Sequence, residues 1–335
     1  DIIIAVWNQL EFTKNCIESI ERNTGDVEYR LILIDNASDK PAMEYLSALA
    51  QAKKDRVLLI RNEVNLGFLK AANQGMKASD APYVCLLNND TLVTEGWLKE
   101  MIEIAAGSKD IGIVNPSSNN LGQKPLAGEP LEIYAAKIRK EAGNSIDLGA
   151  AIGFCMLIKR EVLDKTGLFD EVYGRGNFED TDLSRKAVKA GYRCVRACGS
   201  YVYHRENTSF NKINTFNADF ERNREIFEFR WGKPKRIAYI LDSCDGPSLI
   251  KIKQETVELA RNGNWAWYFF KGAEDLPKHS NIMRVKVSGR NFYPEVFWRI
   301  IKKKKKFDEI HIGEPKYGRV LEMLSFWHKA KVKYY

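Results

Sequence analysis

Short apolar runs alternate with amphipathic segments along the first part of the chain. Five runs rich in Ile, Leu and Val have the length of strands: Ile2–Val6, Leu31–Asp35, Val57–Arg61, Tyr83–Leu87 and 111–115. Between them, apolar residues recur at helical spacing in segments 10–22, 41–52, 67–78 and 95–106. Because the strand segments are apolar on both faces, the pattern predicts an α/β fold with a mostly parallel central sheet covered by helices.

The next part of the chain is less regular. Segment 116–144 is rich in Gly, Pro and Asn, and we expect a flexible loop there. The apolar run 150–158 predicts a strand, and a short helix is expected from Arg160. An acidic segment at 178–182 then leads into a helix ending at Lys189, and a strand is expected at 192–197.

The alternation begins again after a helix predicted at 217–230. Strands are expected at Arg236–Leu241, 266–270, 282–287, Glu309–Ile312 and 332–335, with helices at 249–262, 294–303 and 316–328. The sequence therefore predicts two domains, residues 1–232 and residues 233–335. The second is expected to be a smaller Rossmann-like α/β domain, part of a larger one.

Charge divides unevenly between the two predicted domains. Residues 1–232 carry a net charge of −3 and residues 233–335 carry +11, which together give the +8 of the whole chain. The basic half indicates an anionic partner, such as a membrane surface, an acidic acceptor or a phosphate-bearing ligand. No nucleic-acid-binding module is recognisable, so nucleic acid is the least favoured partner.

Cysteine usage and hydropathy indicate the compartment. The six cysteines are scattered without a C-x-x-C pair, which favours a reduced, cytoplasmic protein and does not predict structural zinc. No run approaches the roughly 18 apolar residues that span a bilayer. We therefore expect a cytoplasmic protein, with at most a peripheral contact at the inner face of the membrane.

Polar residues follow three of the predicted parallel strands, at the edge where such sheets bind ligands. Asn8 follows the first strand, Asp35 ends the second, and Asn88-Asn89-Asp90 follows the fourth. Asp35 could accept hydrogen bonds from a pyrimidine or a ribose, or it could only form a turn. The Asn-Asn-Asp run could supply oxygen ligands to a hard cation, or it too could be a turn.

Two further features carry candidate chemistry. Glu179, Asp180 and Asp182 place three carboxylates within four residues, which exceeds what a helix cap needs and requires a functional or cationic partner. One of them could act as a general base towards a hydroxyl group. His204 follows an apolar triplet; it could be an ordinary buried histidine or a ligand.

Together these segments resemble the family 2 glycosyltransferases, inverting enzymes with the GT-A fold. The resemblance covers about residues 1–210. It rests on Ile3-Ile4-Ala5-Val6-Trp7-Asn8, Ile34-Asp35-Asn36-Ala37-Ser38, Asn65-Leu66-Gly67-Phe68, Leu87-Asn88-Asn89-Asp90, Gly167-Leu168-Phe169-Asp170 and Phe178-Glu179-Asp180-Thr181-Asp182-Leu183. The sequence departs from the usual family pattern at Asn88, where the first acid of the D-x-D-like motif is expected, and at Ala5, where Pro is usual.

The resemblance implies a role for each candidate. The nucleotide sugar would be bound by Val6, Asn8, Asp35, Asn65, Gly67, Asn88 and Asn89. Asp90 and His204 would bind Mg²⁺ or Mn²⁺, and Asp180 would be the catalytic base, with Glu179 as the alternative.

The implied activity is that of an inverting hexosyltransferase in surface-polysaccharide assembly. The donor would be dTDP-rhamnose, because the Asn-Asn-Asp variant resembles that of rhamnosyltransferases, or a UDP-sugar. The acceptor would be a hydroxyl group of a glycan or a lipid-linked acceptor. Residues 233–335 resemble, more vaguely, the N-terminal half of a family 4 glycosyltransferase with the GT-B fold, which is expected to be inactive alone.

Two other classes compete with the transferase hypothesis. A nucleotidylyltransferase would need a Gly-rich basic loop after the first strand, and residues 6–10 contain neither Gly nor Lys. A non-catalytic scaffold, or a nucleotide-sugar-binding domain of a larger multidomain glycosyltransferase, would keep the fold without turnover.

Overall fold

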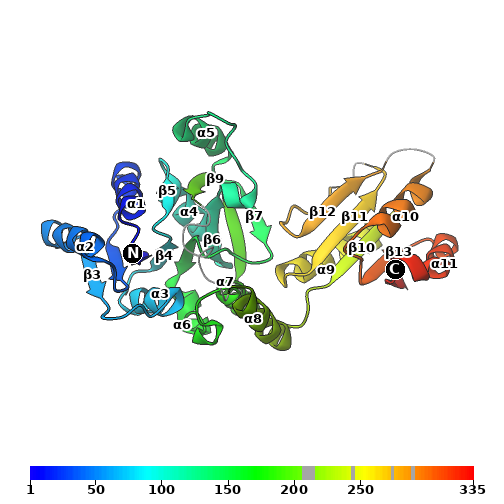
Figure 1. Ribbon diagram of the computed structural model, residues 1–335. Helices are drawn as coiled ribbons and strands as arrows, with labels where there is room; N and C mark the ends of the chain where they lie inside the picture. Colours follow the sequence, from blue (N-terminus) through cyan, green and yellow to red (C-terminus); the bar gives the residue numbers. More distant parts are fainter. Residues whose placement is uncertain (206–215, 243–245, 273–274, 288–290) are drawn as a thin grey trace. The chain divides into compact units, whose positions relative to one another are not determined.

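The computed structural model describes residues 1–205, 216–242, 246–272, 275–287 and 291–335 (Figure 1). The chain divides into two compact units, Asp1–Ile146 with Ala150–Arg230, and Asp147–Gly149 with Trp231–Tyr335. Within the described residues, no helix combines the length and the apolar character that a membrane span requires. Each unit is built around its own sheet.

The first sheet has nine strands. They are β1 (Ile2–Val6), β2 (Leu31–Asp35), β3 (Val57–Arg61), β4 (Tyr83–Leu87), β5 (Thr91–Val93), β6 (Ile111–Ser117), β7 (Ser145–Leu148), β8 (Cys155–Lys159) and β9 (Arg193–His204). Their order is β3-β2-β1-β4-β8-β6-β9-β5, and β7 pairs with β9 outside this path. Strands β3, β2, β1 and β4 are parallel, as are β6 and β9, whereas β8 and β5 run antiparallel to their neighbours.

The helices of this part connect successive strands. They are α1 (Leu10–Asn23), α2 (Lys40–Ala52), α3 (Phe68–Lys77), α4 (Trp97–Ala106), α5 (Leu131–Ile138), α6 (Arg160–Thr166), α7 (Glu179–Lys189) and α8 (Phe216–Trp231). Short 3-10 turns lie at η1 (Asn119–Leu121), η2 (Arg139–Glu141) and η3 (Glu171–Tyr173). The predicted α/β fold with a mostly parallel central sheet is confirmed.

Side chains of β1 alternate between the two layers of helices. Ile2, Ile4 and Val6 belong to one buried cluster that includes side chains of α1, α2 and α4. On the opposite face α3 approaches very closely, because a Cβ atom on Gly75 would lie 2.3 Å from Cγ2 of Ile3. A central strand that is buried on both faces has to be apolar at nearly every position, as β1 is.

Three predicted segments differ from the structure in a way that affects the site. The strand expected at 150–158 begins only at Cys155. The side chain of Asn115 forms hydrogen bonds with the backbone of Ile152 and Cys155, so the backbone of Ile152 does not pair with a neighbouring strand. The strand expected at 192–197 continues to His204 as β9. The loop expected at 116–144 contains α5 and two 3-10 turns.

The second unit contains a five-stranded parallel sheet. Its strands are β10 (Arg236–Leu241), β11 (Trp265–Phe270), β12 (Ile282–Lys286), β13 (Glu309–Ile312) and β14 (Lys331–Tyr334), in the order β12-β11-β10-β13-β14. Its helices are α9 (Gly246–Arg261), α10 (Phe292–Lys302), α11 (Pro315–Met323) and α12 (Ser325–His328). In chain order the strands read 3-2-1-4-5, which is the order of a Rossmann-type sheet.

Two separate cores lie on the two faces of this second sheet. Side chains of α9 pack on Ile237, Tyr239 and Leu241, whereas side chains of α10 and α11 pack on Ala238 and Ile240. The unit therefore has helices on both faces, like other doubly wound α/β domains.

Candidate active site

The carboxyl ends of β1, β2 and β3 form one edge, since the strands are adjacent and parallel. Val6 lies opposite Asp35, and Asp35 lies opposite Arg61. The buried carboxylate of Asp35 accepts the Ser38 amide at 2.9 Å and forms an ion pair with the Arg61 guanidinium. The turn expected as one alternative for Asp35 is therefore present, and Asp35 has a cationic neighbour that the sequence analysis missed.

At the end of β1, Trp7 is exposed, whereas Val6 and Asn8 form hydrogen bonds with residues that follow β2. Val6 is fully buried in the core, and its carbonyl oxygen accepts the Asn36 amide at 2.8 Å. Asn8 is held through its backbone amide to Ser38 Oγ, at 2.9 Å, while its Oδ1 accepts the Asp39 amide at 2.7 Å. Trp7, between them, is 50% exposed. A ligand at this edge can therefore reach the Trp7 ring more easily than the Val6 side chain.

A network of side-chain amides holds Asn65 and Gly67 beside this edge. The Asn36 side chain donates to Asn65 Oδ1 at 2.8 Å and accepts from the Leu66 amide at 2.9 Å. Asn65 Oδ1 also accepts the Gly67 amide at 2.8 Å. Gly67 has a φ of 82°, a conformation that favours glycine, and α3 begins directly after it.

The ladder between β5 and β9 brings Asp90 and His204 together. Thr91 lies opposite His204, and the Arg205 amide donates to the Asp90 carbonyl at 3.0 Å. As a result, His204 Nε2 lies 3.0 Å from Asp90 Oδ1. Both side chains are largely buried, with 14% and 11% of their surfaces exposed. The two predicted metal ligands, 114 residues apart in sequence, are thus direct neighbours.

The 3-10 turn η1 holds His204 from the other side. Asn119 binds the His204 backbone twice, from Nδ2 to the carbonyl at 2.8 Å and through Oδ1 to the amide at 2.9 Å. The Asn120 side-chain amide lies against His204 Nδ1, and Asn120 Oδ1 is buried without a hydrogen-bond partner in the described structure. If the amide turned by 180°, Oδ1 would accept a hydrogen bond from Nδ1–H and leave Nε2 free for a cation.

Asn88 and Asn89 lie differently with respect to this pair. Asn88 Nδ2 is 3.4 Å from His204 Nε2, so the Asn88 side chain is next to the imidazole. Asn89 instead donates to Thr13 Oγ1 at 3.0 Å, which ties it to α1. Both residues were expected to bind the nucleotide sugar, but only Asn88 lies against His204.

Helix α7 begins with Glu179 and Asp180 in its first turn. The preceding residues Asn177 and Phe178 both have a φ of 74°, which is unusual for residues other than glycine. The Phe178 ring packs against Phe227 of α8, with a centroid distance of 5.4 Å. Packing from α8 therefore helps to hold a strained turn directly before the two acids.

The acid pair differs in its hydrogen bonds. Asp180 accepts the Gly153 amide at 3.0 Å, the Thr181 amide at 2.6 Å and the Thr181 hydroxyl at 3.1 Å. Glu179 is buried, and its Oε2 has no partner among the described residues. Burial and the neighbouring Asp180 raise the pKa of Glu179 to about 8. Burial also raises the pKa of Asp180, against the opposing effect of its hydrogen bonds.

These contacts locate the proton and the charge near neutral pH. Two carboxylates this close cannot both ionise easily, so one retains its proton. The donors from Gly153 and Thr181 stabilise a negative charge on Asp180. Backbone amides also face the Glu179 carboxylate, but its Oε2 is buried without a partner among the described residues, and burial with the neighbouring Asp180 outweighs those amides. Asp180 is therefore the ionised member and Glu179 the protonated one.

Asp182 has a structural explanation. It accepts the Tyr173 hydroxyl at 3.1 Å and lies 2.8 Å from the Lys186 ammonium and 3.5 Å from the Arg230 guanidinium. The cationic partner expected for the acidic cluster is thus present for Asp182, which leaves Glu179 and Asp180 as the functional candidates.

Gly153 and Phe154 link the acid pair to the histidine. The Gly153 amide binds Asp180, and the next ring, Phe154, stacks on His204 with centroids 5.3 Å apart and planes inclined by 17°. The Phe154 carbonyl accepts the Asn88 amide at 2.8 Å. Two consecutive residues therefore contact both halves of the predicted site.

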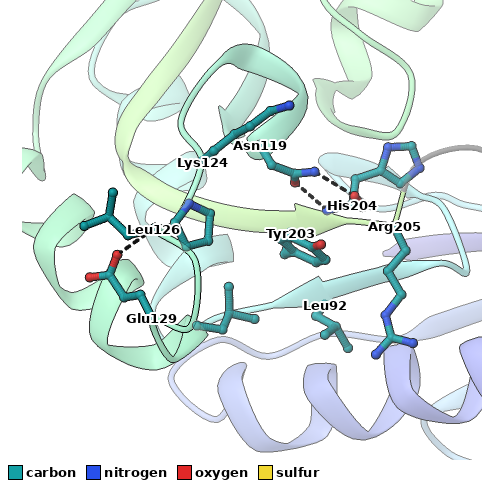
Figure 2. Close-up of a pocket in the computed structure, with 10 residues that line it drawn as sticks. Leu92, Asn119, Lys124, Leu126, Glu129, Tyr203, His204 and Arg205 are labelled. Atoms are coloured by element: carbon teal, nitrogen blue, oxygen red, sulfur yellow. Dashed lines mark hydrogen bonds between the residues drawn. The ribbon is translucent and has the colours of Figure 1, made fainter.

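A pocket of about 800 Å³ opens beside His204 (Figure 2). It lies between β5, the end of β9 and the segment from η1 to α5. Its lining comprises Leu92, Asn119, Lys124, Pro125, Leu126, Glu129, Leu131, Tyr203, His204 and Arg205. It thus combines apolar side chains with two cationic ones, next to the histidine.

Few side chains that could bind a divalent cation lie together at this site. Among the residues that the structure describes, no group of three or more His, Cys, Asp or Glu side chains is arranged to hold a metal. The Asp90–His204 pair offers two ligands, with Asn88 beside them. A cation bound through one carboxylate and substrate phosphates needs no complete protein cage, so the residues fit a metal shared with a diphosphate.

Comparisons with known proteins define the class and then the family. The fold is similar to that of the mannosyltransferase PcManGT from Pyrobaculum calidifontis in complex with GDP-Man and Mn²⁺, with a TM-score of 0.50. The match covers 69% of this chain and 62% of that one, and the two sequences are 16% identical. That likeness establishes a GT-A-like α/β fold. By sequence, residues 1–167 match the family model described as glycosyl transferase family 2. The chain therefore contains a glycosyltransferase family 2 domain.

Curated relatives match more than half of this chain. The chain is 26% identical to the succinoglycan biosynthesis protein ExoO of Rhizobium meliloti (strain 1021), over 63% of this chain and 62% of the relative. It is 26% identical to the uncharacterized protein y4gI of Sinorhizobium fredii, over 69% of this chain and 27% of the relative. The chain covers only 27% to 39% of the length of the first relatives it matches.

Proposed function

We propose that the first unit is an inverting glycosyltransferase, which moves a sugar from a nucleoside diphosphate donor to a hydroxyl group of a glycan or lipid-linked acceptor. Surface-polysaccharide assembly is the setting that the relative ExoO supports. The observation that carries the proposal is the Gly153-Phe154 link between Asp180 and His204. It brings a candidate base and a candidate cation site together at the ligand-binding edge of the sheet.

Asp180 is the catalytic base in this proposal. The acceptor hydroxyl proton passes to the Asp180 carboxylate as the acceptor oxygen forms a bond to the anomeric carbon. The bond from that carbon to the diphosphate breaks on the opposite face, and its electron pair leaves with the nucleotide. The Gly153 and Thr181 donors fix the orientation of the carboxylate, while the protonated Glu179 avoids a second charge beside it.

Asp90 and His204 would hold Mg²⁺ or Mn²⁺, with Asn88 beside them. Such a cation neutralises negative charge on a departing diphosphate. Asn120 and Phe154 orient the His204 ring, one at its edge and the other on its face. Asn119 fixes the backbone of the same residue.

The nucleoside would lie along the ends of β1 and β2. In this proposal Asp35 and Asn8 would bind the base and ribose, and Asn65 and Gly67 border the same edge. The exposed Trp7 ring offers a surface for stacking. The donor we propose is dTDP-rhamnose or a UDP-sugar.

The proposal is tested by the release of nucleoside diphosphate from a panel of donors, with Mn²⁺ and with EDTA, in the presence of acceptor glycans. We expect metal-dependent release from one donor, abolished in Asp180→Asn and retained in Asp164→Asn, an exposed aspartate of α6. Nucleotide binding without turnover in all conditions would favour the scaffold alternative. The absence of both nucleotide binding and turnover would refute the proposal.

A further inference from the structure

Helix α12 of the second unit contacts both α10 and α11, and the three helices leave large apolar side chains exposed. The exposed fractions are 57% for Trp298, 38% for Val320, 82% for Met323, 81% for Phe326 and 54% for Trp327. The inner sides of α10 and α11 already pack on the core of their own unit. The outward side chains are therefore not needed to complete that core.

Cationic side chains accompany these apolar ones. Those exposed on the same helices and the turns that follow them are Arg299, Lys302, Lys304, Lys305, Lys316, Arg319 and Lys329. Glu295 is paired with Arg299, and Glu322 accepts the Tyr334 hydroxyl at 3.0 Å. The acids of α10 and α11 thus contact neighbouring side chains, and the surface carries a clear excess of positive charge.

The aromatic and cationic groups are also in direct contact. Lys302 Nζ lies 3.8 Å from the centroid of the Trp298 ring, and the rings of Phe326 and Trp327 are 6.0 Å apart. Surfaces that enter the headgroup region of a bilayer combine large apolar side chains, such as Trp, Phe and Met, with neighbouring Lys and Arg. Each Lys or Arg near an anionic leaflet contributes on the order of 1 kcal/mol of attraction.

We propose that this surface, defined by Trp298, Val320, Met323, Phe326 and Trp327 with its surrounding Lys and Arg residues, docks on an anionic phospholipid bilayer. The positive charge provides long-range attraction, and the apolar side chains enter the interface. The net +11 of residues 233–335 indicated an anionic partner in general. The structure assigns the surface and favours a membrane, because neither a nucleic acid nor a soluble acidic ligand requires so much exposed apolar surface. The inference does not depend on the transfer reaction.

The test is co-sedimentation of the whole chain with vesicles of phosphatidylcholine alone and of phosphatidylcholine mixed with phosphatidylglycerol. We expect binding to the anionic vesicles, weakened by salt. The triple variant Met323→Ser/Phe326→Ser/Trp327→Ser should bind at least about tenfold more weakly. Lys302→Glu/Lys304→Glu/Lys305→Glu should lose the preference for anionic lipid.

The matched control changes exposed residues of the first unit, Val64→Ser/Ile133→Ser and Lys140→Glu. These variants should bind vesicles like the wild type, and all variants should unfold at wild-type temperatures. The proposal is overturned if the wild type does not sediment with anionic vesicles, or if the control variants lose binding equally. It is also overturned if sedimentation velocity shows that the wild type is a dimer which the triple variant dissociates, since a second copy would then cover this surface.

Discussion

The two units place chemistry on different parts of similar sheets. In the first, the carboxyl ends of β1, β2 and β4 lead to Asn8, Asp35 and Asn88, and Asn88 lies next to His204, a residue from a distant segment. In the second, β10 is followed by Asp242, whose carboxylate forms an ion pair with Lys271 after the neighbouring β11. There the unusual surface is instead on the helices, where aromatic and basic side chains face outward.

The difference shows that a parallel sheet alone does not define a site. Both units have the edge at which α/β proteins bind ligands. Only the first adds elements from later in the chain, namely β9 with His204 and α7 with Asp180. We therefore expect substitutions in these added elements to reduce the proposed transfer, and substitutions at the sheet edge of the second unit to leave it unchanged.

The largest effect is expected for Asp180→Asn. Loss of the general base should reduce transfer by about 10³-fold, within the usual range for such groups, while the Kd for nucleotide changes little. Steady-state kinetics and calorimetry measure the two quantities. A parallel loss of nucleotide affinity would indicate that Asp180 acts in donor binding instead.

His204→Ala should have the next largest effect. Removal of one of two protein ligands should weaken Mn²⁺ binding by about 10- to 100-fold, with a similar fall in transfer. Titration of Mn²⁺, followed by the relaxation of water protons, reports the affinity without turnover. Unchanged Mn²⁺ affinity in His204→Ala would show that His204 is not a ligand of the cation.

A smaller effect is expected for Asn120, which touches His204 without reaching the cation. Asn120→Ala should weaken Mn²⁺ binding by about tenfold, because the imidazole loses its orienting partner. Asn120→Asp should retain affinity, since its carboxylate can accept a hydrogen bond from Nδ1–H. The ¹⁵N shifts of the His204 ring should report the change in the proton-bearing nitrogen. Equal behaviour of the two variants would refute the orienting role.

The pH dependence of stability should follow from Glu179. Its pKa of about 8 lies above the ordinary value of 4.5, so the folded chain binds more protons than the unfolded chain between these values. The free energy of unfolding should therefore decrease as the pH rises through this window. Glu179→Gln should make that decrease shallower. Urea denaturation at pH 6 and pH 9 would measure the difference, and an identical slope in the variant would contradict it.

The smallest effect is expected in the second unit. Asp242→Asn removes the acid at the end of β10 but should change transfer by less than about twofold, because the site belongs to the first unit. A loss comparable to that in Asp180→Asn would show that both units take part in the reaction.

Much of the fold follows from local patterns in the sequence. Continuous apolar runs such as Ile2–Val6 predict buried parallel strands. Four of the five runs in the first part of the chain form strands with the predicted bounds, and the fifth, predicted at 111–115, extends to Ser117. The strand predicted at 150–158 was partly wrong, because the side chain of Asn115 binds the backbone of Ile152 in that segment. That contact joins residues 37 positions apart, and no local pattern reports it.

The site is predictable where one segment carries its own signal. Asp90 and the Glu179-Asp180 pair stand out through their motifs and positions. Arg61 was missed, although it ends β3 as Asp35 ends β2. Asn120 and Phe154 were also missed, because they come from segments whose composition indicated only a loop and a strand. The protonation of Glu179 depends on burial, which only the folded chain defines.

The central claim is that the first unit binds a nucleotide through a cation at Asp90 and His204. Calorimetric titration of UDP and dTDP into the wild type, Asp90→Asn and Asp242→Asn, each with Mn²⁺ and with EDTA, tests it most directly. The account predicts Mn²⁺-dependent binding of one nucleotide, weakened at least about tenfold in Asp90→Asn and unchanged in Asp242→Asn. Binding that is independent of Mn²⁺ and equally tight in Asp90→Asn would contradict it.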